Sequence, residues 1–320
     1  MLRVFVWNEG QLQTLSGSDL ASAVWFDMQS PTEEEYELVG RLTGFTLPLY
    51  ETLAEIENSS NLSLDADILT LSLPTVYNDV DMLSRSVCGF VLSRQRLVTI
   101  RFSDNLTFSH FLPRPPAANV ELAQHLFVSL LEGIVSRQAD RLEKMREELE
   151  GLSRRVFQRK SDKNRSPQNT EQGLQHVLVI LGQAYEAISY IRDCQLGIGR
   201  ICAYVLAAVD WIPKTLRERL HLANKDVASL NEFSTHLTDK IQFLLDSTLG
   251  FINVSQNSLI KVLTIVSIVG IPPTLIAGIY GMNFKDIPEL SWSYGYGYAW
   301  AVMVASAVLP LAWFRKKGWI

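Results

Sequence analysis

A charge-free tripeptide, Gly281-Met282-Asn283, directly follows a long apolar run, and an acidic residue, Glu289, comes shortly after it. Asparagine carries a neutral amide that both donates and accepts hydrogen bonds. Because an apolar run of this length suits a membrane span, the amides would stand where an ion first leaves bulk water. The tripeptide therefore suggests the mouth of a pore.

A second candidate for ion chemistry is a stripe of uncharged residues on the helix that we expect before the tripeptide. Their alternating spacings of three and four place them on one helix face. On a pore axis, the hydroxyl groups would offer stepping sites and the apolar side chains would form constrictions that gate by dewetting. Small residues are equally typical of packing between spans, and spacing alone leaves both interpretations open. The stripe comprises Asn257, Ile260, Leu263 (or Thr264), Ser267, Ile271, Thr274 and Gly278.

Two apolar runs are long enough to cross a membrane, for which about 20 residues are needed. The first, 262–280, has no charged residue, and the second, 298–314, ends in Arg315-Lys316-Lys317. Basic residues beside a span favour its cytoplasmic side. The sequence therefore predicts a multi-pass protein of the inner (plasma) membrane, in contact with lipids, with both termini in the cytoplasm. A pair of buried core helices is the other interpretation, and the aromatic-rich connection between the runs counts against it.

The rest of the chain has the composition of a soluble protein. Of 320 residues 20% are charged, and the net charge of −5 argues against a nucleic-acid partner, which would need a basic face. Cys88, Cys194 and Cys202 show no metal-ligand spacing, so we expect reduced, buried thiols. The first residues lack the apolar core of a signal peptide, which favours a cytoplasmic N-terminal part. The histidines are scattered, and no P-loop, GxSxG or HExxH pattern occurs, so we expect neither an enzyme nor an organic cofactor.

The elements that must position the tripeptide change from mixed α/β to helical along the chain. Ser30-Pro31 is typical of a helix start, and a helix that begins after Pro213 meets no proline before the apolar run. That helix would be roughly 100 Å long and would need partner helices, because it has no core of its own. The predicted strands are 2–7, 23–26, 68–77, 87–92 and 97–102. The predicted helices are 33–42, 120–160, 170–209 and 214–280.

The fold class that follows is α+β, with an N-terminal cytoplasmic α/β domain, a long helical stalk and two C-terminal transmembrane helices. The predicted divisions are 1–116 for the α/β domain, 117–258 for cytoplasmic helices and stalk, 259–281 for the pore-lining span, 282–297 for an external loop, 298–314 for the second span and 315–320 for a basic cytoplasmic tail.

The segment 261–284 (KVLTIVSIVGIPPTLIAGIYGMNF), then IPEL at 287–290 and a tail of Arg-Lys-Lys-Gly-Trp, resembles the CorA family of divalent-cation (magnesium and cobalt) channels. The tripeptide matches that family's Gly-Met-Asn signature. The match is strong over about the last 65 residues, and the upstream order of elements agrees in outline. The resemblance implies a funnel-shaped homopentamer whose pore is lined by the first span of each subunit.

The resemblance also implies roles for individual residues. Gly281, Met282 and Asn283 would form the selectivity loop, and the stripe would line the pore. Asp246 would help to bind a regulatory Mg²⁺ between subunits, and Asp79 is the loosely aligned partner carboxylate. The loop carries two acidic residues, Asp286 and Glu289, and one basic residue, Lys285. Its net charge of −1 per subunit would attract cations.

The implied function is passive influx of hydrated Mg²⁺, with Co²⁺ and Ni²⁺ as further candidate ions, and closure by Mg²⁺ inside the cell. One departure from the family is the consecutive pair Pro272-Pro273, where one proline is usual. Met282 favours the magnesium branch over the zinc-transporting ZntB branch, which commonly has valine there. The alternatives are a Zn²⁺ transporter of the ZntB type and a membrane-anchored coiled-coil scaffold that transports nothing.

Overall fold

The computed structural model describes residues 1–8, 11–15, 20–55, 62–79, 82–104, 106–109, 111, 113, 115–116, 121–158, 167–283 and 287–319. The chain divides into two compact units. One comprises Met1–Ser161 and Val177–Leu245, and the other comprises Asp162–His176 and Asp246–Ile320.

The predicted α+β class is confirmed, and most predicted elements occur within a few residues of the expected bounds. The strands are β1 (Leu2–Asn8), β2 (Gln11–Thr14), β3 (Trp25–Gln29), β4 (Leu62–Asp65), β5 (Ile68–Asp79), β6 (Met82–Leu92) and β7 (Leu97–Arg101). The helices are α1 (Glu33–Thr43), α2 (Tyr50–Ala54), α3 (Leu106–Ser109), α4 (Leu122–Gln158), α5 (Pro167–Ala208), α6 (Lys214–Tyr280) and α7 (Gly295–Lys316), with short 3₁₀ turns η1 (Leu20–Ser22) and η3 (Pro288–Ser291).

Two local predictions were wrong. Ser30 does not cap α1: it lies before the helix with a φ of 43°, and Thr32 is the N-cap. The Thr32 hydroxyl accepts from the Glu35 amide while the Glu35 carboxylate accepts from the Thr32 amide, a capping box that satisfies two donors at once. The helix predicted from residue 170 begins three residues earlier, at Pro167, because a first-turn proline has no N–H for the helix to leave unpaired.

Within the described residues of the first unit, seven strands form one sheet in the order β2-β1-β3-β7-β6-β5-β4. Neighbouring strands are antiparallel except β3 and β7, which are parallel. Side chains alternate between the two faces with the period of two that a strand imposes. Along β6, Phe90 and Leu92 pack on one face, whereas Val87 and Val91 pack on the other. Both faces are therefore buried.

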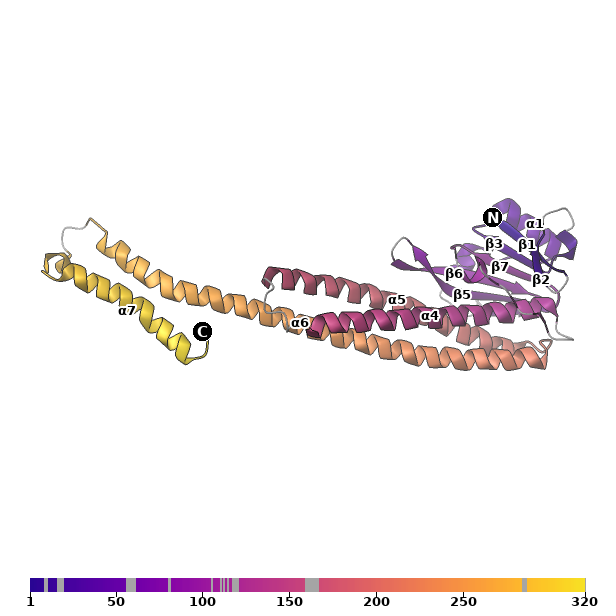
Figure 1. The fold of residues 1–320 in the computed structure, drawn as a ribbon. Coiled ribbons are helices and arrows are strands. Elements are labelled where there is room, and N and C mark those ends of the chain that lie inside the picture. The colour runs from indigo at the N-terminus through magenta and orange to yellow at the C-terminus, as the bar shows by residue number, and fades with distance from the viewer. Residues whose placement is uncertain are drawn as a thin grey trace. The chain divides into compact units, whose positions relative to one another are not determined.

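Helices α4, α5 and α6 cover one face of this sheet, while α1 and α2 pack on the other (Figure 1). The α4–α5–α6 layer joins the sheet in a single apolar cluster that includes Phe127, Ile198 and Leu220. The turn from α5 to α6 is fastened by Arg217, whose guanidinium donates to the carbonyls of Leu206 and Val209 at the end of α5. A cation at a helix C-terminus satisfies carbonyls that have no helical partner.

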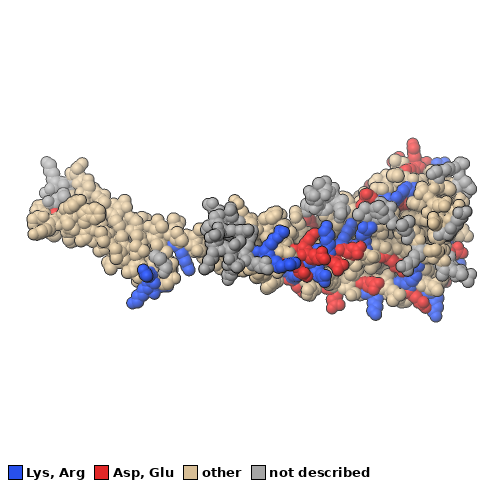
Figure 2. Space-filling model, viewed as in Figure 1, with Lys and Arg blue, Asp and Glu red and all other residues tan. Residues whose placement is uncertain are grey.

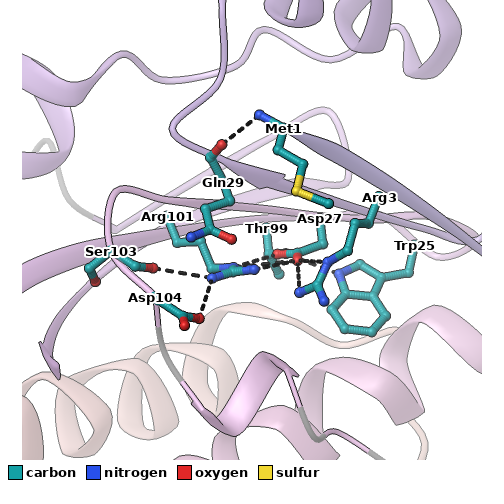
Figure 3. Close-up of polar contacts among 9 residues, drawn as sticks. All are labelled: Met1, Arg3, Trp25, Asp27, Gln29, Thr99, Arg101, Ser103 and Asp104. Atoms are coloured by element: carbon teal, nitrogen blue, oxygen red, sulfur yellow. Dashed lines mark hydrogen bonds and ion pairs between the residues drawn. The ribbon is translucent and has the colours of Figure 1, made fainter. Parts of the chain in front are cut away.

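A buried ion network joins β1, β3 and β7 (Figure 3). The Asp27 carboxylate accepts from the guanidinium groups of Arg101 and Arg3, at 3.0 and 2.5 Å respectively, and from the Thr99 hydroxyl at 2.8 Å. Trp25 donates its indole N–H to the same hydroxyl. A buried charge survives only when it is paired and hydrogen-bonded, so the network fixes the parallel β3–β7 pairing.

In the second unit, α6 continues from Asp246 to Tyr280 and is followed by η3 and α7. Gly295, the first residue of α7, approaches the Glu289 carbonyl so closely that a Cβ would lie 2.0 Å from its oxygen. Only glycine fits there. The described helices include two that are long and apolar enough to cross a membrane, α6 and α7, and α7 contains the predicted run 298–314.

Candidate ion pathway

The tripeptide forms the turn that ends α6. The Gly281 amide donates to the Ala277 carbonyl at 2.9 Å, and the Met282 amide donates to the Ile279 carbonyl at 3.2 Å. Backbone amides of the tripeptide thus pair with carbonyls of the last turn of α6. The side chains of Met282 and Asn283 remain exposed. The sequence prediction that neutral amides stand at the very end of the span is met by this geometry.

The segment 291–298, which leads into α7, carries aromatic side chains and no charged ones. Trp292 and Tyr298 pack edge to face with ring centroids 5.7 Å apart, and Tyr294 and Tyr296 are almost fully exposed. Aromatic rings of this kind gather where a bilayer meets water. Glu289 lies half-buried in η3. Asp286 falls outside the described residues.

The predicted pore stripe lies on the open side of α6. Its apolar members Ile260, Leu263 and Ile271 are 60%, 68% and 62% exposed. Of the other members, Asn257, Thr274 and Gly278 are exposed, and Ser267 is half-buried.

The opposite face of the same span carries a seam of half-buried residues. At 100° per residue the mean direction of this seam points about 180° away from the stripe. The hairpin of α6 and α7 therefore covers one face of α6 and leaves the stripe free for other contacts. The seam comprises Ile265, Val269, Pro272, Ile276 and Tyr280.

The threonines of the span fold their hydroxyl groups back on the helix. Thr264 donates to the Ile260 carbonyl at 2.8 Å, and Thr274 donates to the Gly270 carbonyl at 2.9 Å. A hydroxyl that has donated its proton to the backbone keeps its oxygen lone pairs for other partners. Thr274 can accordingly accept a hydrogen bond from water on the stripe side.

The Pro272-Pro273 pair does not interrupt α6, which runs unbroken to Tyr280. Neither proline has an N–H, so the carbonyls of Ile268 and Val269 lose their usual helical donors. Both prolines lie on the half-buried side. The side chains of the pair thus lie on the covered face of the helix.

Of the two predicted regulatory carboxylates, only the side chain of Asp246 lies within the described residues. Asp246 is exposed on α6. Asp79 ends β5, and its side chain falls outside the described residues. Among the residues that the structure describes, no three His, Cys, Asp or Glu side chains gather as a ready metal site.

A contact that the sequence reasoning missed joins the start of the apolar part of α6 to the residues after α7. The Lys261 ammonium lies 5.8 Å from the ring centroid of Trp319, although the two residues are far apart in the chain. One feature of the sequence could have drawn attention to Lys261: it is the only charged residue between Asp246 and Lys285. Only the hairpin brings it to the tail.

Comparison with known proteins places these features in a family. Residues 21–316 match the family described as CorA-like Mg²⁺ transporter protein. A protein from Yersinia pseudotuberculosis named magnesium transport protein CorA is 31% identical over the whole of both chains. Proteins of the same name from Haemophilus influenzae and Escherichia coli are each 29% identical, over 100% and 97% of this chain and 100% and 96% of their own.

Solved structures agree on the fold. The complete structure of the CorA magnesium transporter from Methanocaldococcus jannaschii covers 100% of this chain and 99% of its own, with a TM-score of 0.75 at 19% identity. The full-length CmaX protein covers 98% of this chain and 96% of its own, with a TM-score of 0.67 at 15% identity. At these identities the likeness concerns the fold alone.

Proposed function

The chain belongs to the CorA-like Mg²⁺ transporter family, a family of transporters and not of enzymes, and on that premise we propose that it is a channel for passive influx of hydrated Mg²⁺. The observation that carries the proposal is the position of Gly281-Met282-Asn283 at the end of α6, directly after its uncharged apolar part 262–280, whose exposed face carries the stripe. Co²⁺ and Ni²⁺, which are also hydrated divalent cations, would share the path.

The pore would form from several copies of the chain. One copy leaves large apolar side chains of the stripe, such as Leu263 and Ile271, exposed. A symmetric ring of copies around the stripe would cover them and enclose a path, and the family resemblance implies five. The stripe's residues would then meet their own counterparts around one axis, as in a closed cyclic oligomer.

Selection at the mouth would act on the ion's water shell. Mg²⁺ is small and releases its water reluctantly, so proteins commonly hold it through retained waters. A ring of Asn283 amides with nearby carbonyls would hydrogen-bond that shell without removing it. The span 262–280 contains no carboxylate, which agrees with transit of a hydrated ion. Asp286 and Glu289 would raise the local concentration of cations outside the mouth.

Closure would follow from Mg²⁺ bound between subunits. Asp246 and the partner carboxylate Asp79 would repel each other when unoccupied, and a bound ion would neutralise them and favour the closed state. Loss of the bound ion would release the stalks and allow the Ile260–Leu263 constriction to hydrate.

Reconstitution in liposomes tests this function. Fluxes of Mg²⁺, Co²⁺, Ni²⁺ and Zn²⁺ would be measured side by side with no energy source but the gradient. We expect Mg²⁺ uptake that dissipates its gradient. A flux of Zn²⁺ alone would favour the ZntB-type alternative, and the absence of any cation flux would favour the scaffold alternative.

A further inference from the structure

The cytoplasmic ends of α6 and α7 carry a cluster of positive charge. Lys261 is the only charged residue from 247 to 284, and Arg315, Lys316 and Lys317 are the only ones from 290 to 320. All four side chains are exposed. Figure 2 shows the blue side chains gathered at this end of an otherwise tan surface. Among the described residues, no ion pair joins these four cations to an acidic side chain, so they can accept an anion from outside the chain.

The tail folds back on the end of α7, so that Trp313, Phe314 and Trp319 form an aromatic wall. Gly318 has a φ of 70°, a left-handed conformation that glycine adopts without strain. This turn lets the Trp319 amide donate to the Phe314 carbonyl at 3.0 Å. The Trp319 ring then stacks on Phe314 with centroids 5.4 Å apart, and Phe314 also contacts Trp313 edge to face.

Two of the cations lie against this wall. The Lys261 ammonium is 5.8 Å from the Trp319 ring centroid, and the Lys317 ammonium is 4.7 Å from that of Trp313. An aromatic face holds an ammonium in place but satisfies none of its N–H donors. The donors remain available to an anion in the same place.

The position of the cluster selects the anion. Lys261 directly precedes the apolar run of α6, and Arg315 directly follows that of α7, so both stand at the same boundary of the hydrocarbon core. Tryptophan rings favour the depth of the headgroups and the first carbons of the acyl chains. Clusters of basic residues at the cytoplasmic ends of spans attract anionic headgroups.

We propose that Lys261, Arg315, Lys316 and Lys317, with the wall of Trp313, Phe314 and Trp319, form a binding site for the headgroup of an anionic phospholipid of the inner leaflet. The phosphate would bridge Lys261 of α6 and the basic residues of α7, and the lipid would hold the two spans together. The site depends on the two spans alone and not on which ion the protein transports.

Lipid binding to the purified full-length protein in neutral detergent tests the proposal without a flux measurement. Phosphatidylglycerol and phosphatidylcholine of the same acyl chains would be titrated, with bound lipid counted by native mass spectrometry and the thermal midpoint followed. We expect phosphatidylglycerol, and not phosphatidylcholine, to bind and to raise the midpoint. Equal binding of the two lipids would overturn the proposal, as would an equal midpoint shift with inorganic phosphate.

Two variants separate the built site from general charge. The variant K261Q/R315Q/K316Q/K317Q should bind phosphatidylglycerol at least about tenfold more weakly, because it removes all four cations that would attract the anionic headgroup. The control R41Q/R155Q/K214Q/K225Q removes the same charge from exposed positions of the first unit and should bind like the parent. The variant W319A keeps every charge and should bind severalfold more weakly. Parent-like binding by the first or the third variant would overturn the site.

Discussion

Ile260 and Val262 stand two residues apart on α6 with nearly equal exposure, 60% and 58%, yet they point in opposite directions. Two residues turn a helix by about 200°. Ile260 belongs to the stripe, and Val262 lies on the side of the half-buried seam. The two aliphatic side chains therefore form a matched pair that separates an effect of the pore face from an effect of the helix as a whole.

The first prediction uses this pair. Ile260→Asn should allow Mg²⁺ uptake to persist at high internal Mg²⁺, because a polar side chain hydrates an apolar constriction that closes by dewetting. Val262→Asn should close normally. Uptake into liposomes loaded with Mg²⁺ provides the measurement, and a leak of equal size in both variants would contradict the assignment of the pore face.

The second prediction concerns the proposed sensor. Asp246→Ala should shift closure to higher internal Mg²⁺, because the bound ion would lose one of its carboxylates. Asp226→Ala removes the same charge from another exposed position of α6 and should leave closure unchanged. If uptake by Asp246→Ala responds to internal Mg²⁺ as the parent does, Asp246 is not a ligand of the sensor.

The third prediction concerns the buried network of the sheet. Asp27→Asn should lower the free energy of unfolding by about 3–5 kcal/mol, because Arg101, only 2% exposed, would lose its buried counter-charge. The control is Asp67→Asn, whose partner Arg94 lies 3.3 Å away and whose side chain is largely exposed. It should cost no more than about 1 kcal/mol. Thermal unfolding of both full-length variants in detergent compares them, and equal losses would refute the network's role.

The fourth prediction follows from the three free, buried cysteines. Burial raises the pKa of the Cys88 thiol, and it raises the pKa of Cys194 and of Cys202 to about 12. Maleimide at neutral pH should therefore label the folded protein only after unfolding, whereas an added cysteine at exposed position 225 should react at once.

The pH dependence of stability has a definite sign. The unfolded thiols ionise near pH 9 and the folded thiols near 12, so the folded state binds more protons in between. The thiols' contribution is complete below about pH 9 and should fall as the pH rises toward 12. A thermal midpoint that falls less steeply above pH 9 in Cys202→Ala than in the parent supports this, and identical slopes would count against it.

Sequence reasoning reached the features that local pattern determines. The start of α6 follows from Pro213 and its length from the absence of a proline before the apolar run, and the tripeptide's place at its end needs no tertiary knowledge. The edge strands β2 and β4 were missed because each has only four residues, too few for a period of two to stand out. The Ser30 cap was misassigned because the Thr32–Glu35 capping box was overlooked.

Contacts between distant segments were beyond the sequence. The parallel pairing of β3 with β7 brings Asp27 to Arg101 across more than 70 residues, and no local signal announces it. Arg219 of α6 likewise forms a two-point contact with Glu132 of α4, at 2.8 and 2.6 Å. The same holds at the spans, where the contact of Lys261 with Trp319 depends on how the hairpin closes.

The central claim is that Asn283, as one of a ring of amides, selects the hydrated ion at the pore mouth. Mg²⁺ uptake by liposomes containing Asn283→Ala tests it most directly, with Gln13→Ala, an exposed amide on β2, as the control and with assembly checked by the oligomer's mass. We predict that Asn283→Ala assembles like the parent and takes up no Mg²⁺ above protein-free liposomes, while Gln13→Ala transports normally. Uptake at the parent's rate by an assembled Asn283→Ala variant would contradict the claim.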